Sequence, residues 1–576
     1  MGRRKILSIP LLFISLLIPV CAVVVETPLG PVEGQTLTVK SGPNVNIFLG
    51  IPFAKPPIGE LRFKKPEPLE PWKDTLNASE WRAKCVCTPM MPEEFDKLVF
   101  PGPQSEDCLY LNVFAPASKS KSFPNGYAVM VNIHGGGFGI GSAREAPKFQ
   151  PAAQHLVSKQ VIMVSIQYRL SILGFLTLGD KSAPGNLGLW DQTMALRWIN
   201  QNIASFGGDP NRITVMGESA GSFSVSALSI SPHSYNLFQS ALLMSGGILN
   251  SLRPVSQMVD IAKALANKLN CKGSNKEIVA CLRNKDPIEM EAVLLRLTLT
   301  GDVFEMLMPT LDGDFFTKDL TTLFEEAPKK PTMAGVCAFE GALFALPLFP
   351  APMPFAVNNV SSFTYEELEA KLNLALLLRN YKHHQLVKEL ALHEYVGSRG
   401  GKSDSRFLLE QWITLTGDLI ITMNVVNENR LRIKLGWPVY FYNYEFVNAK
   451  LYPKSVDFKH ATHATELSYL FGQRLFFGME PFVPFTDKEL AMINLTTSLW
   501  TNFAKYNNPT PEPVFGTKWE AASQGNQLPY LRIDLKPKMK KNYRPDMHQF
   551  WNELVPKIEK MDFGPESRRS ETHEEL

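Results

Sequence analysis

The sequence has few cysteines, no marked excess of either charge and no long apolar run after its amino terminus. Seven cysteines are spread over 576 residues, and 59 lysines and arginines face 56 aspartates and glutamates. This balance excludes the concentrated basic face that nucleic-acid binding requires. The cysteines form no Cys-x-x-Cys pair and no histidine cluster lies near them, so we predict neither a metal site nor a cofactor. After the amino terminus, no run of about 18 apolar residues predicts a membrane span in the mature chain.

The amino terminus has the three parts of a secretory signal peptide. A basic segment at residues 3–5 precedes an apolar stretch at 6–20, and a V-x-A cleavage pattern ends at Ala22. We therefore expect residues 1–22 to be removed, so that the mature chain begins at Val23. A membrane anchor is the alternative, but the apolar stretch is short for a span and contains two prolines.

The carboxyl terminus is polar and ends in a tetrapeptide that resembles a retention signal. Residues 561–576 are expected to form a polar tail, whose last four residues, HEEL at 573–576, resemble the Glu-Leu-ended signals that a receptor in the secretory pathway reads. Together with the signal peptide, this ending predicts a protein of the endoplasmic reticulum lumen. Three Asn-x-Ser/Thr triplets fit a luminal surface and are candidate glycosylation sites: Asn77, Asn359 and Asn494.

Between these ends, short apolar runs alternate with helical stretches. The runs at 128–133, 161–166 and 241–245 are continuous, which is typical of strands buried on both faces. Strands that alternate with helices predict βαβ units and therefore an α/β fold, with a mostly parallel central sheet and helices on both faces. From about 251 to 440 the pattern is more helical and irregular, which indicates insertions that cap one end of the sheet. We expect residues 23–560 to form one domain.

One short motif indicates a nucleophile. In ITVMGESAGSFSV, residues 213–225, a predicted strand turns into a predicted helix at Ser219, which lies between Gly217 and Gly221. A strand–turn–helix of this type is a nucleophile elbow, in which the serine oxygen is exposed on a strained corner. The pattern can also arise by chance, so this interpretation depends on finding a base, an acid and an oxyanion site elsewhere in the chain.

Other segments supply candidates for those three parts. A strand that ends in HGGG, residues 134–137, offers backbone N–H groups free of side chains, and Ala220 adds a donor at the start of the helix. Glu340 lies in an apolar segment, where a carboxylate needs a partner such as a histidine. An ordinary glycine turn and a surface glutamate are the alternatives. For the base, His460 and His463 both come suitably late in the chain, and spacing alone does not choose between them.

Several longer motifs give the chain a family resemblance. SEDCLYLNVF at 105–114 and FGGDPNRITVMGESAGS at 206–222 occur together with HGGGF, QYRL, NLGLWDQ, LMPTLDGDFF and HATELSYLFG. With these motifs the chain resembles the type-B carboxylesterases, α/β-hydrolases whose family also includes cholinesterases and neuroligins. It is most like the non-specific carboxylesterases of the endoplasmic reticulum lumen. The resemblance covers roughly residues 25–555 and implies an α/β-hydrolase fold with helical insertions that cap an active-site gorge.

The resemblance also implies roles for individual residues. It gives the catalytic triad as Ser219, the nucleophile, Glu340, the acid, and His463, the base. His463 is preferred to its neighbour because Glu466, three positions later, matches the family pattern. The oxyanion hole would consist of the backbone N–H groups of Gly136, Gly137 and Ala220.

Structural bonds follow from the same resemblance. The expected disulfides are Cys108 with Cys87, or alternatively with Cys85, and Cys271 with Cys281. The expected ion pairs are Arg62 with Glu106 and Arg169 with Asp191. Cys337, at a position where many relatives have Asn, is expected to be an unpaired thiol.

Other functions are compatible with the same fold. A non-catalytic adhesion module would lack part of the triad and carry a membrane anchor, whereas this chain has every catalytic part. A cholinesterase would have a tryptophan in the loop before Cys108, where it binds a quaternary ammonium group. Residues 88–107 contain no tryptophan. The family's tryptophan position holds Leu98, although Phe95 or Phe100 could substitute. A lipase of the bile-salt-activated type stays open, since nothing in the sequence fixes acyl length.

The sequence therefore predicts a serine carboxylesterase of broad specificity that hydrolyses small-molecule esters through an acyl-enzyme. Counting back from Pro309 places two acyl-pocket positions of the family on Val303 and Glu305. Acetyl-selective relatives have phenylalanines there, so we expect this chain to prefer butyryl or longer acyl groups. The alternative is an insertion in this loop that shifts the register, so that Phe304 fills the pocket.

Overall fold

The computed structural model describes residues 21–38, 43–89, 101–144, 151, 154–299, 307–346, 355–357, 359–397, 401–452, 458–472, 484–522, 525 and 527–562. Within these ranges, thirteen strands form one sheet in the order β1-β2-β3-β7-β9-β8-β12-β13-β14-β15-β16-β17, with β4 beside β2. The strands of this sheet are β1 (Cys21–Thr27), β2 (Gly30–Leu37), β3 (Val45–Pro52), β4 (Leu76–Asn77), β7 (Tyr110–Pro116), β8 (Tyr127–Ile133), β9 (Val161–Ile166), β12 (Gly208–Glu218), β13 (Ser240–Met244), β14 (Thr332–Cys337), β15 (Val439–Tyr444), β16 (Tyr530–Ile533) and β17 (Lys538–Lys540).

The centre of the sheet is parallel and its two ends are antiparallel. From β9 through β8, β12, β13, β14 and β15 to β16, each neighbouring pair is parallel. The pairs that join β1, β2, β3, β7 and β9, and the pair of β16 with β17, are antiparallel. All residues of β8, β9, β13, β14 and β15 are buried, which accounts for their continuous apolar runs. The predicted α/β fold with helices around a mostly parallel central sheet is confirmed, and the antiparallel ends are an addition to it.

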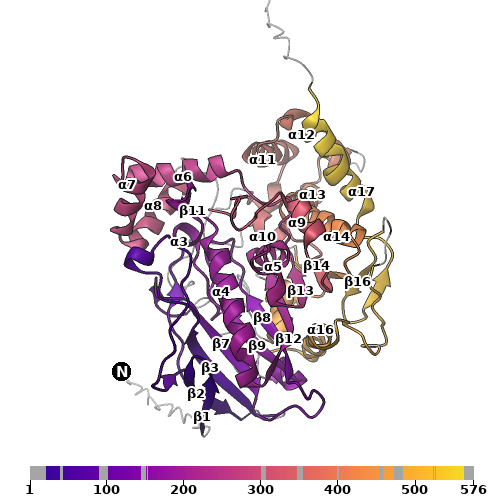
Figure 1. The fold of residues 1–576 in the computed structure, drawn as a ribbon. Helices are drawn as coiled ribbons and strands as arrows, with labels where there is room; N and C mark the ends of the chain where they lie inside the picture. Colours follow the sequence, from indigo (N-terminus) through magenta and orange to yellow (C-terminus); the bar gives the residue numbers. More distant parts are fainter. Residues whose placement is uncertain are drawn as a thin grey trace, which may run out of the picture.

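Helices surround this sheet (Figure 1). The α-helices are α3 (Ser171–Phe175), α4 (Leu187–Asn202), α5 (Ala220–Ile230), α6 (Val255–Lys268), α7 (Asn275–Arg283), α8 (Pro287–Leu299), α9 (Leu320–Glu326), α10 (Ala342–Ala345), α11 (Tyr365–Leu378), α12 (His384–Leu392), α13 (Ser405–Gly417), α14 (Met423–Lys434), α15 (Thr465–Leu470), α16 (Asp487–Tyr506), α17 (Pro545–His548) and α18 (Val555–Lys560). Two short pairs of strands lie outside the main sheet: β5 (Lys84–Cys85) with β6 (Gln104–Ser105), and β10 (Thr177–Asp180) with β11 (Ala183–Pro184).

Both faces of the sheet are covered by apolar clusters. Neighbouring side chains of a strand point to opposite faces, so Val215 of β12 packs into one cluster and Met216 into the other. Val225 of α5 belongs to the first cluster, and Trp500 of α16 belongs to the second. The central strands are therefore held between α5 on one face and α16 on the other, which fixes the position of their ends.

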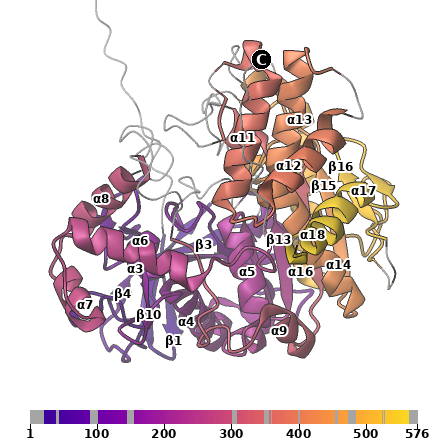
Figure 2. The ribbon, with the colours of Figure 1, turned by 90° about the horizontal axis from the view of Figure 1, so that it is seen from above.

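The irregular middle part of the sequence forms two groups of helices. Seen from above, α6, α7 and α8 form one group, and α11, α12 and α13 form another on the opposite side of α5 (Figure 2). Both groups lie at the upper end of the molecule in Figure 1. They belong to residues 251–440, where insertions were expected.

The parallel centre brings the ends of several strands to one edge of the sheet. β8 ends at Ile133, β12 at Glu218 and β14 at Cys337, and the segment that follows each strand contains one part of the predicted site. Because parallel strands end at the same edge, these parts lie together, as is usual for ligand sites in α/β folds.

The predicted terminal segments are only partly described. Cys21 and Ala22, the last residues of the predicted signal peptide, lie in β1, and residues 1–20 are outside the described ranges. Residues 563–576, with the HEEL ending, are also outside them. In the described part of the chain, none of the helices is both long enough and apolar enough to cross a membrane.

Candidate active site

Ser219 occupies a strained turn between β12 and α5. Its backbone has φ 54° and ψ −124°, a left-handed conformation that side-chain-bearing residues rarely adopt. The turn is fixed on both sides, because Ser219 N–H donates to Met244 O at 2.9 Å and Ser219 O accepts from Phe223 N–H at 3.0 Å. The residue stays partly exposed although its neighbours are buried. This is the conformation of a nucleophile elbow.

The two glycines of the motif are required by close packing. A Cβ atom on Gly221 would lie 2.1 Å from the Ile133 carbonyl oxygen, and one on Gly217 would lie 2.4 Å from the Gly221 carbonyl carbon. Both distances are shorter than any side chain tolerates. The elbow is therefore pressed against the end of β8, which brings it next to the glycine-rich segment.

The glycine-rich segment directly follows β8 and packs against Ser219. A Cβ atom on Gly135 would lie 3.2 Å from Ser219 Cβ and 2.8 Å from Glu218 O. Gly136 has φ +102° and Gly137 φ +59°, and both are partly exposed beside the elbow. Glycine adopts these left-handed values without a steric penalty, so the backbone N–H groups can be turned toward a ligand. With Ala220 at the first position of α5, these are the three predicted oxyanion donors.

His134, which directly precedes the glycines, is packed against neighbouring residues of the loop. Its Nδ1 lies 2.9 Å from Gly135 O and its ring stacks on Tyr168 at a centroid distance of 4.5 Å. Burial lowers the pKa of His134 to about 4, so this imidazole is neutral at physiological pH. It supports the loop rather than adding charge to the site.

Glu340 follows β14 and is 1% exposed. Its Oε1 accepts hydrogen bonds from Ser245 Oγ at 2.5 Å and from Cys337 N–H at 2.6 Å. Its Oε2 lies 2.6 Å from His463 Nδ1. The buried carboxylate thus has a histidine partner, as its apolar sequence context predicted, and it accepts hydrogen bonds from two further donors.

The loops that carry Glu340 and His463 are joined by backbone bonds. Phe339 pairs with Thr462 in a parallel bridge, and Phe339 N–H donates to Ala461 O at 2.9 Å. These bonds hold the acid and the base together although 123 positions separate them in the chain. His460 is not part of this arrangement: its ring packs against Phe339 at a centroid distance of 4.8 Å.

The His463 imidazole lies between two carboxylates. Its Nε2 is 3.1 Å from Glu218 Oε1, while its Nδ1 contacts Glu340. Burial opposes protonation of this ring, but the charges of Glu218, Glu340 and Glu466 outweigh it and raise the pKa of His463 to about 9. Among the hydrogen bonds of the described residues, none joins His463 to Ser219. The resting imidazole therefore faces the residue before the serine.

Sequence reasoning missed the carboxylate of Glu218. Its position could have been noticed, because Glu218 directly precedes the serine in the motif G-x-S-x-G. A residue at the end of a buried strand points to one face or the other, and its direction could not be read from the motif. Ser245, a donor to Glu340, was also missed, since it lies in an ordinary Ser-Gly-Gly turn after β13.

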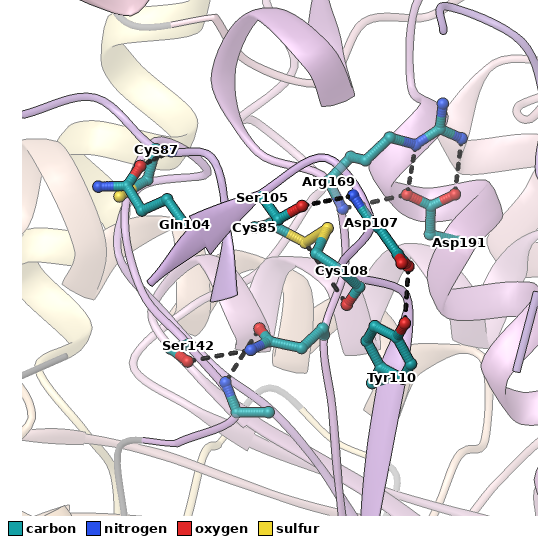
Figure 3. The surroundings of a disulfide bond; sticks show 12 residues. Cys85, Cys87, Gln104, Ser105, Asp107, Cys108, Tyr110, Ser142, Arg169 and Asp191 are labelled. Atoms are coloured by element: carbon teal, nitrogen blue, oxygen red, sulfur yellow. Dashed lines mark hydrogen bonds and ion pairs between the residues drawn. A yellow bond between two sulfur atoms is a disulfide. The ribbon is translucent and has the colours of Figure 1, made fainter. Parts of the chain in front are cut away.

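The disulfides correct one prediction. Cys108 is joined to Cys85, with a Cα–Cα distance of 4.9 Å, so the pairing of Cys108 with Cys87 is wrong. The reason is the short β5–β6 ladder, in which Cys85 is opposite Ser105 and hence close to Cys108. Cys87 lies beyond that ladder, where its N–H donates to Gln104 Oε1 at 3.0 Å (Figure 3).

The remaining predicted bonds are present. Cys271, which precedes α7, is joined to Cys281 in the last turn of that helix, and Cys337 is a buried thiol outside any disulfide. The ion pairs are Arg62 with Glu106, with an Nε–Oε1 distance of 2.6 Å, and Arg169 with Asp191, with an NH2–Oδ1 distance of 2.7 Å. The second pair is almost completely buried, and Asp191 accepts the Arg169 backbone N–H as well.

Several predicted positions lie outside the described residues or stay untested. Val303, Phe304 and Glu305 are outside them, and so is the loop of residues 90–100 that contains Leu98. The three candidate glycosylation sites, Asn77, Asn359 and Asn494, are exposed. Within the described ranges, no group of three His, Cys, Asp or Glu side chains could hold a metal ion.

An open pocket of about 1140 Å³ lies elsewhere, between α7 and the turn that joins β10 to β11. Its charged wall is partly neutralised, since Lys65 Nζ lies 2.7 Å from Asp314 Oδ2. Ser219, Glu340 and His463 are not among the residues that line it. The chemistry of the site therefore does not depend on this pocket.

The sheet, the strained serine at its parallel edge and the buried acid–histidine pair define an α/β-hydrolase. Comparison with known proteins agrees: the profile of the carboxylesterase family matches residues 22–551. The chain is 34% identical to esterase cest-33 of Caenorhabditis elegans, over 91% of this chain and 93% of the relative. It is 32% identical to acylcarnitine hydrolase of Mus musculus (94% and 93%) and 35% identical to cholinesterase of the same species (93% and 88%). The chain belongs to the carboxylesterase family and is a carboxylic-ester hydrolase.

Proposed function

We propose that this hydrolase acts by a serine mechanism, with Ser219 as nucleophile, His463 as base and Glu340 as the acid that orients the base. The observation that carries the proposal is the buried 2.6 Å contact between Glu340 Oε2 and His463 Nδ1. A carboxylate that accepts the Nδ1 proton fixes the tautomer in which Nε2 is free to accept a second proton. The strained elbow supports the other half of the proposal, because it exposes a serine oxygen at the same edge.

Acylation begins when His463 Nε2 accepts a hydrogen bond from the Ser219 hydroxyl. Ser219 Oγ attacks the ester carbonyl carbon and its proton passes to Nε2. The carbonyl oxygen becomes an oxyanion, which the backbone N–H groups of Gly136, Gly137 and Ala220 stabilise; one such donor is worth about 3–4 kcal/mol in a well-studied serine protease. The intermediate then collapses, the C–O bond of the ester breaks, and His463 gives its proton to the leaving alcohol.

Deacylation repeats these steps with water. His463 takes a proton from a water molecule, whose oxygen attacks the acyl carbon. The bond to Ser219 Oγ breaks, the serine regains its proton from His463, and the carboxylic acid leaves. Each proton that His463 accepts is returned within the same half-reaction, so the cycle uses only side chains, backbone N–H groups and water.

We propose a broad substrate range with a preference for longer acyl groups. The relatives differ in the ester that their names describe, acylcarnitine in one and choline esters in another. Selectivity for choline esters is not proposed, because residues 88–107 contain no tryptophan to bind the quaternary ammonium. The preference for longer chains rests on the family resemblance, which aligns Val303 with a position where acetyl-selective relatives have phenylalanine.

We also propose that residues 1–22 are a signal peptide, that residues 23–560 form one catalytic domain, and that the HEEL ending holds the enzyme in the endoplasmic reticulum lumen through a retention receptor. A structural disulfide such as Cys85–Cys108 is typical of proteins that fold in this oxidising compartment. The exposed triplets at Asn77, Asn359 and Asn494 are proposed as glycosylation sites there.

The mechanism is tested with Ser219→Ala. Removal of a triad nucleophile costs about 10⁶-fold in kcat in a well-studied serine protease, so hydrolysis of aryl esters should fall to background. An organophosphate should label the wild-type chain at Ser219 alone. Ser182→Ala, in the turn between β10 and β11, is the matched control and should hydrolyse the same esters at the wild-type rate. Hydrolysis by Ser219→Ala at a rate close to that of the control would contradict the mechanism.

A further inference from the structure

A buried carboxyl group on α8 accepts three hydrogen bonds that the proposed reaction does not use. Glu291, in the second turn of this helix, is 1% exposed. Its Oε2 accepts hydrogen bonds from Thr88 Oγ1 at 2.8 Å and from Ser171 Oγ at 2.9 Å. Its Oε1 accepts the Ile172 N–H at 3.2 Å. The carboxyl group therefore joins α8 to two other parts of the chain, the residue after Cys87 and the start of α3.

Thr88 and Ser171 also hold the glycine-rich segment, residues 134–139, by backbone bonds. Ser171 N–H donates to Phe138 O at 2.7 Å. Thr88 N–H donates to the next carbonyl along, Gly139 O, at 2.9 Å. The two acceptors directly follow the glycines of the proposed oxyanion hole. Each donor residue thus binds the carboxyl group with its hydroxyl and the segment with its N–H.

The backbone of this segment depends on support from outside. Gly136, Gly137 and Phe138 are consecutive left-handed residues, with φ +102°, +59° and +61°. The glycines adopt such values freely, but Phe138 has a Cβ atom and is strained there, so its conformation persists only because neighbours hold it. Its donor Ser171 is itself left-handed, with φ 46°. The Phe138 ring packs on Phe175 of α3 at a centroid distance of 4.9 Å, so α3 holds this residue by its side chain as well.

We propose that Glu291 is a positioning residue for the esterase reaction: through Thr88 and Ser171, its carboxyl group holds the glycine-rich segment in the conformation that turns the segment's N–H groups toward the oxyanion. The proposal rests on the proposed function, because it assumes that these groups stabilise the oxyanion of acyl transfer. The oxyanion develops only on the way to the tetrahedral intermediate. A displaced segment should therefore lower kcat and leave KM nearly unchanged.

A merely structural role is the alternative, since the same bonds attach α8 to α3, against which it packs. Loss of Glu291 should lower the stability of the fold in either role. The two roles differ in the molecules that remain folded. In the structural role each folded molecule hydrolyses ester at the wild-type rate, whereas in the positioning role each one is slower.

A neutral side chain of the same shape can make the same bonds. Burial raises the pKa of Glu291 to about 7, although the three hydrogen bonds oppose this shift. In Glu291→Gln the amide oxygen can accept the Ile172 N–H, and the NH2 group can donate to both hydroxyl oxygens. Glu291→Ala offers none of these groups. The pair of variants therefore isolates the contribution of the hydrogen bonds.

The test measures hydrolysis of an aryl ester per active site, with the sites counted by titration to completion with an organophosphate. Outright removal of one oxyanion donor costs about 10²–10³-fold in kcat, so a displaced segment in Glu291→Ala should cost about 10- to 100-fold, with KM within a few-fold of the wild type. Glu291→Gln should recover most of this loss. Glu289→Ala, at an exposed position of the same helix, is the matched control and should have the wild-type kcat.

A trifluoromethyl ketone tests the oxyanion site itself. Ser219 Oγ adds to its carbonyl carbon and gives its proton to His463, which leaves a stable oxyanion, whereas the corresponding trifluoromethyl alcohol cannot be attacked. Glu291→Ala should weaken the ketone by the same factor as it lowers kcat/KM and leave the affinity for the alcohol unchanged. Thr88→Val keeps the backbone N–H but lacks the hydroxyl, so it should show a smaller loss of the same kind and add little to Glu291→Ala.

An unchanged kcat per active site in folded Glu291→Ala would overturn the proposal. So would equal losses in Glu291→Ala and Glu291→Gln, or equal weakening of the ketone and the alcohol. Thermal unfolding checks that each variant is folded. If Glu291→Ala does not fold, Thr88→Val decides the question, because an unchanged ketone affinity there would overturn the proposal. Failure of the proposed function is a separate result, since it appears as hydrolysis that survives Ser219→Ala.

Discussion

Glu218 is the charge closest to the proton that the proposed mechanism transfers, so its removal gives the clearest test of the electrostatics. Glu218→Gln keeps the size of the side chain and its oxygen acceptor but removes the negative charge. At the observed 3.1 Å and an effective dielectric constant of about 20, two unit charges attract each other by about 5 kcal/mol. Measured shifts from one opposite charge at such distances are about one to three pKa units, which bounds the expected effect.

The sign follows from the role of the base. His463 must be neutral to accept the Ser219 proton, so kcat/KM rises with pH as the imidazolium loses its proton. The raised pKa of His463, about 9, places this acid limb above pH 6.5. Without the Glu218 charge the imidazolium is less stable and the pKa falls. We expect the limb of Glu218→Gln to move to lower pH by about one to three units.

Stability should follow the same charge. A histidine whose pKa is higher in the folded state stabilises the fold fully below its unfolded pKa of about 6.5, and this stabilisation is lost as the pH rises through the folded value. Between about pH 6.5 and 9 the wild type should therefore lose more thermal stability than Glu218→Gln.

The assay is the hydrolysis of one aryl ester from pH 5 to 10, with unfolding measured on the same samples. Glu326→Gln, on the surface of α9, is the matched control and should leave both profiles unchanged. An acid limb that stays in place in Glu218→Gln, or moves to higher pH, would refute the reasoning, because it would mean that Glu218 does not stabilise the protonated base.

Four further predictions concern single residues or short segments. His463→Ala should abolish ester hydrolysis as fully as loss of the nucleophile does, while His460→Ala should stay within a few-fold of the wild type; the reverse result would show that the register of HATHATEL was misjudged. Asp191→Ala leaves a buried guanidinium without its partner and should cost about 3–5 kcal/mol, seen as a lower midpoint in urea unfolding, and an unchanged midpoint would contradict the burial of this pair. Deletion of residues 573–576 should send active enzyme into the medium of expressing cells, whereas equal secretion of the full-length chain would rule out retention by HEEL. Val303→Phe should lower kcat/KM for a butyryl or hexanoyl ester relative to the acetyl ester of the same phenol; a wild type that already prefers acetyl and is unchanged by the substitution would remove this loop from the specificity argument.

The fold could be predicted wherever a strand is covered on both faces. Continuous apolar runs such as 128–133 and 161–166 have no polar side, so they belong to the buried parallel centre. The antiparallel β1–β2 hairpin gave no such signal, because its residues are mostly half exposed. The disulfide error has a similar cause: the two-residue β5–β6 ladder that selects Cys85 over Cys87 is too short to produce a pattern in sequence.

The site could be predicted only in part from local patterns. The elbow at Ser219 is local, since the strand, turn and helix are consecutive. The partnership of Glu340 with His463 spans 123 positions, so the apolar surroundings of Glu340 could indicate that a partner exists but not which one. Family resemblance supplied that choice. The proximity of Glu218 to the histidine was found only in the structure, because it depends on where a side chain points at the end of a strand.

Three carboxyl groups surround one imidazole in this site, and residue type alone does not separate their roles. Glu340 accepts hydrogen bonds from three good donors, which suits a group that must hold the base in one tautomer. Glu218, itself buried, lies 3.1 Å from Nε2, the atom that takes the Ser219 proton in the proposed mechanism. Glu466 lies behind the ring against the Cys337 thiol, and burial, followed by the charge of Glu340, raises its pKa to about 7. The place of each carboxyl, at Nδ1, at Nε2 or behind the ring, therefore decides how it acts on the base.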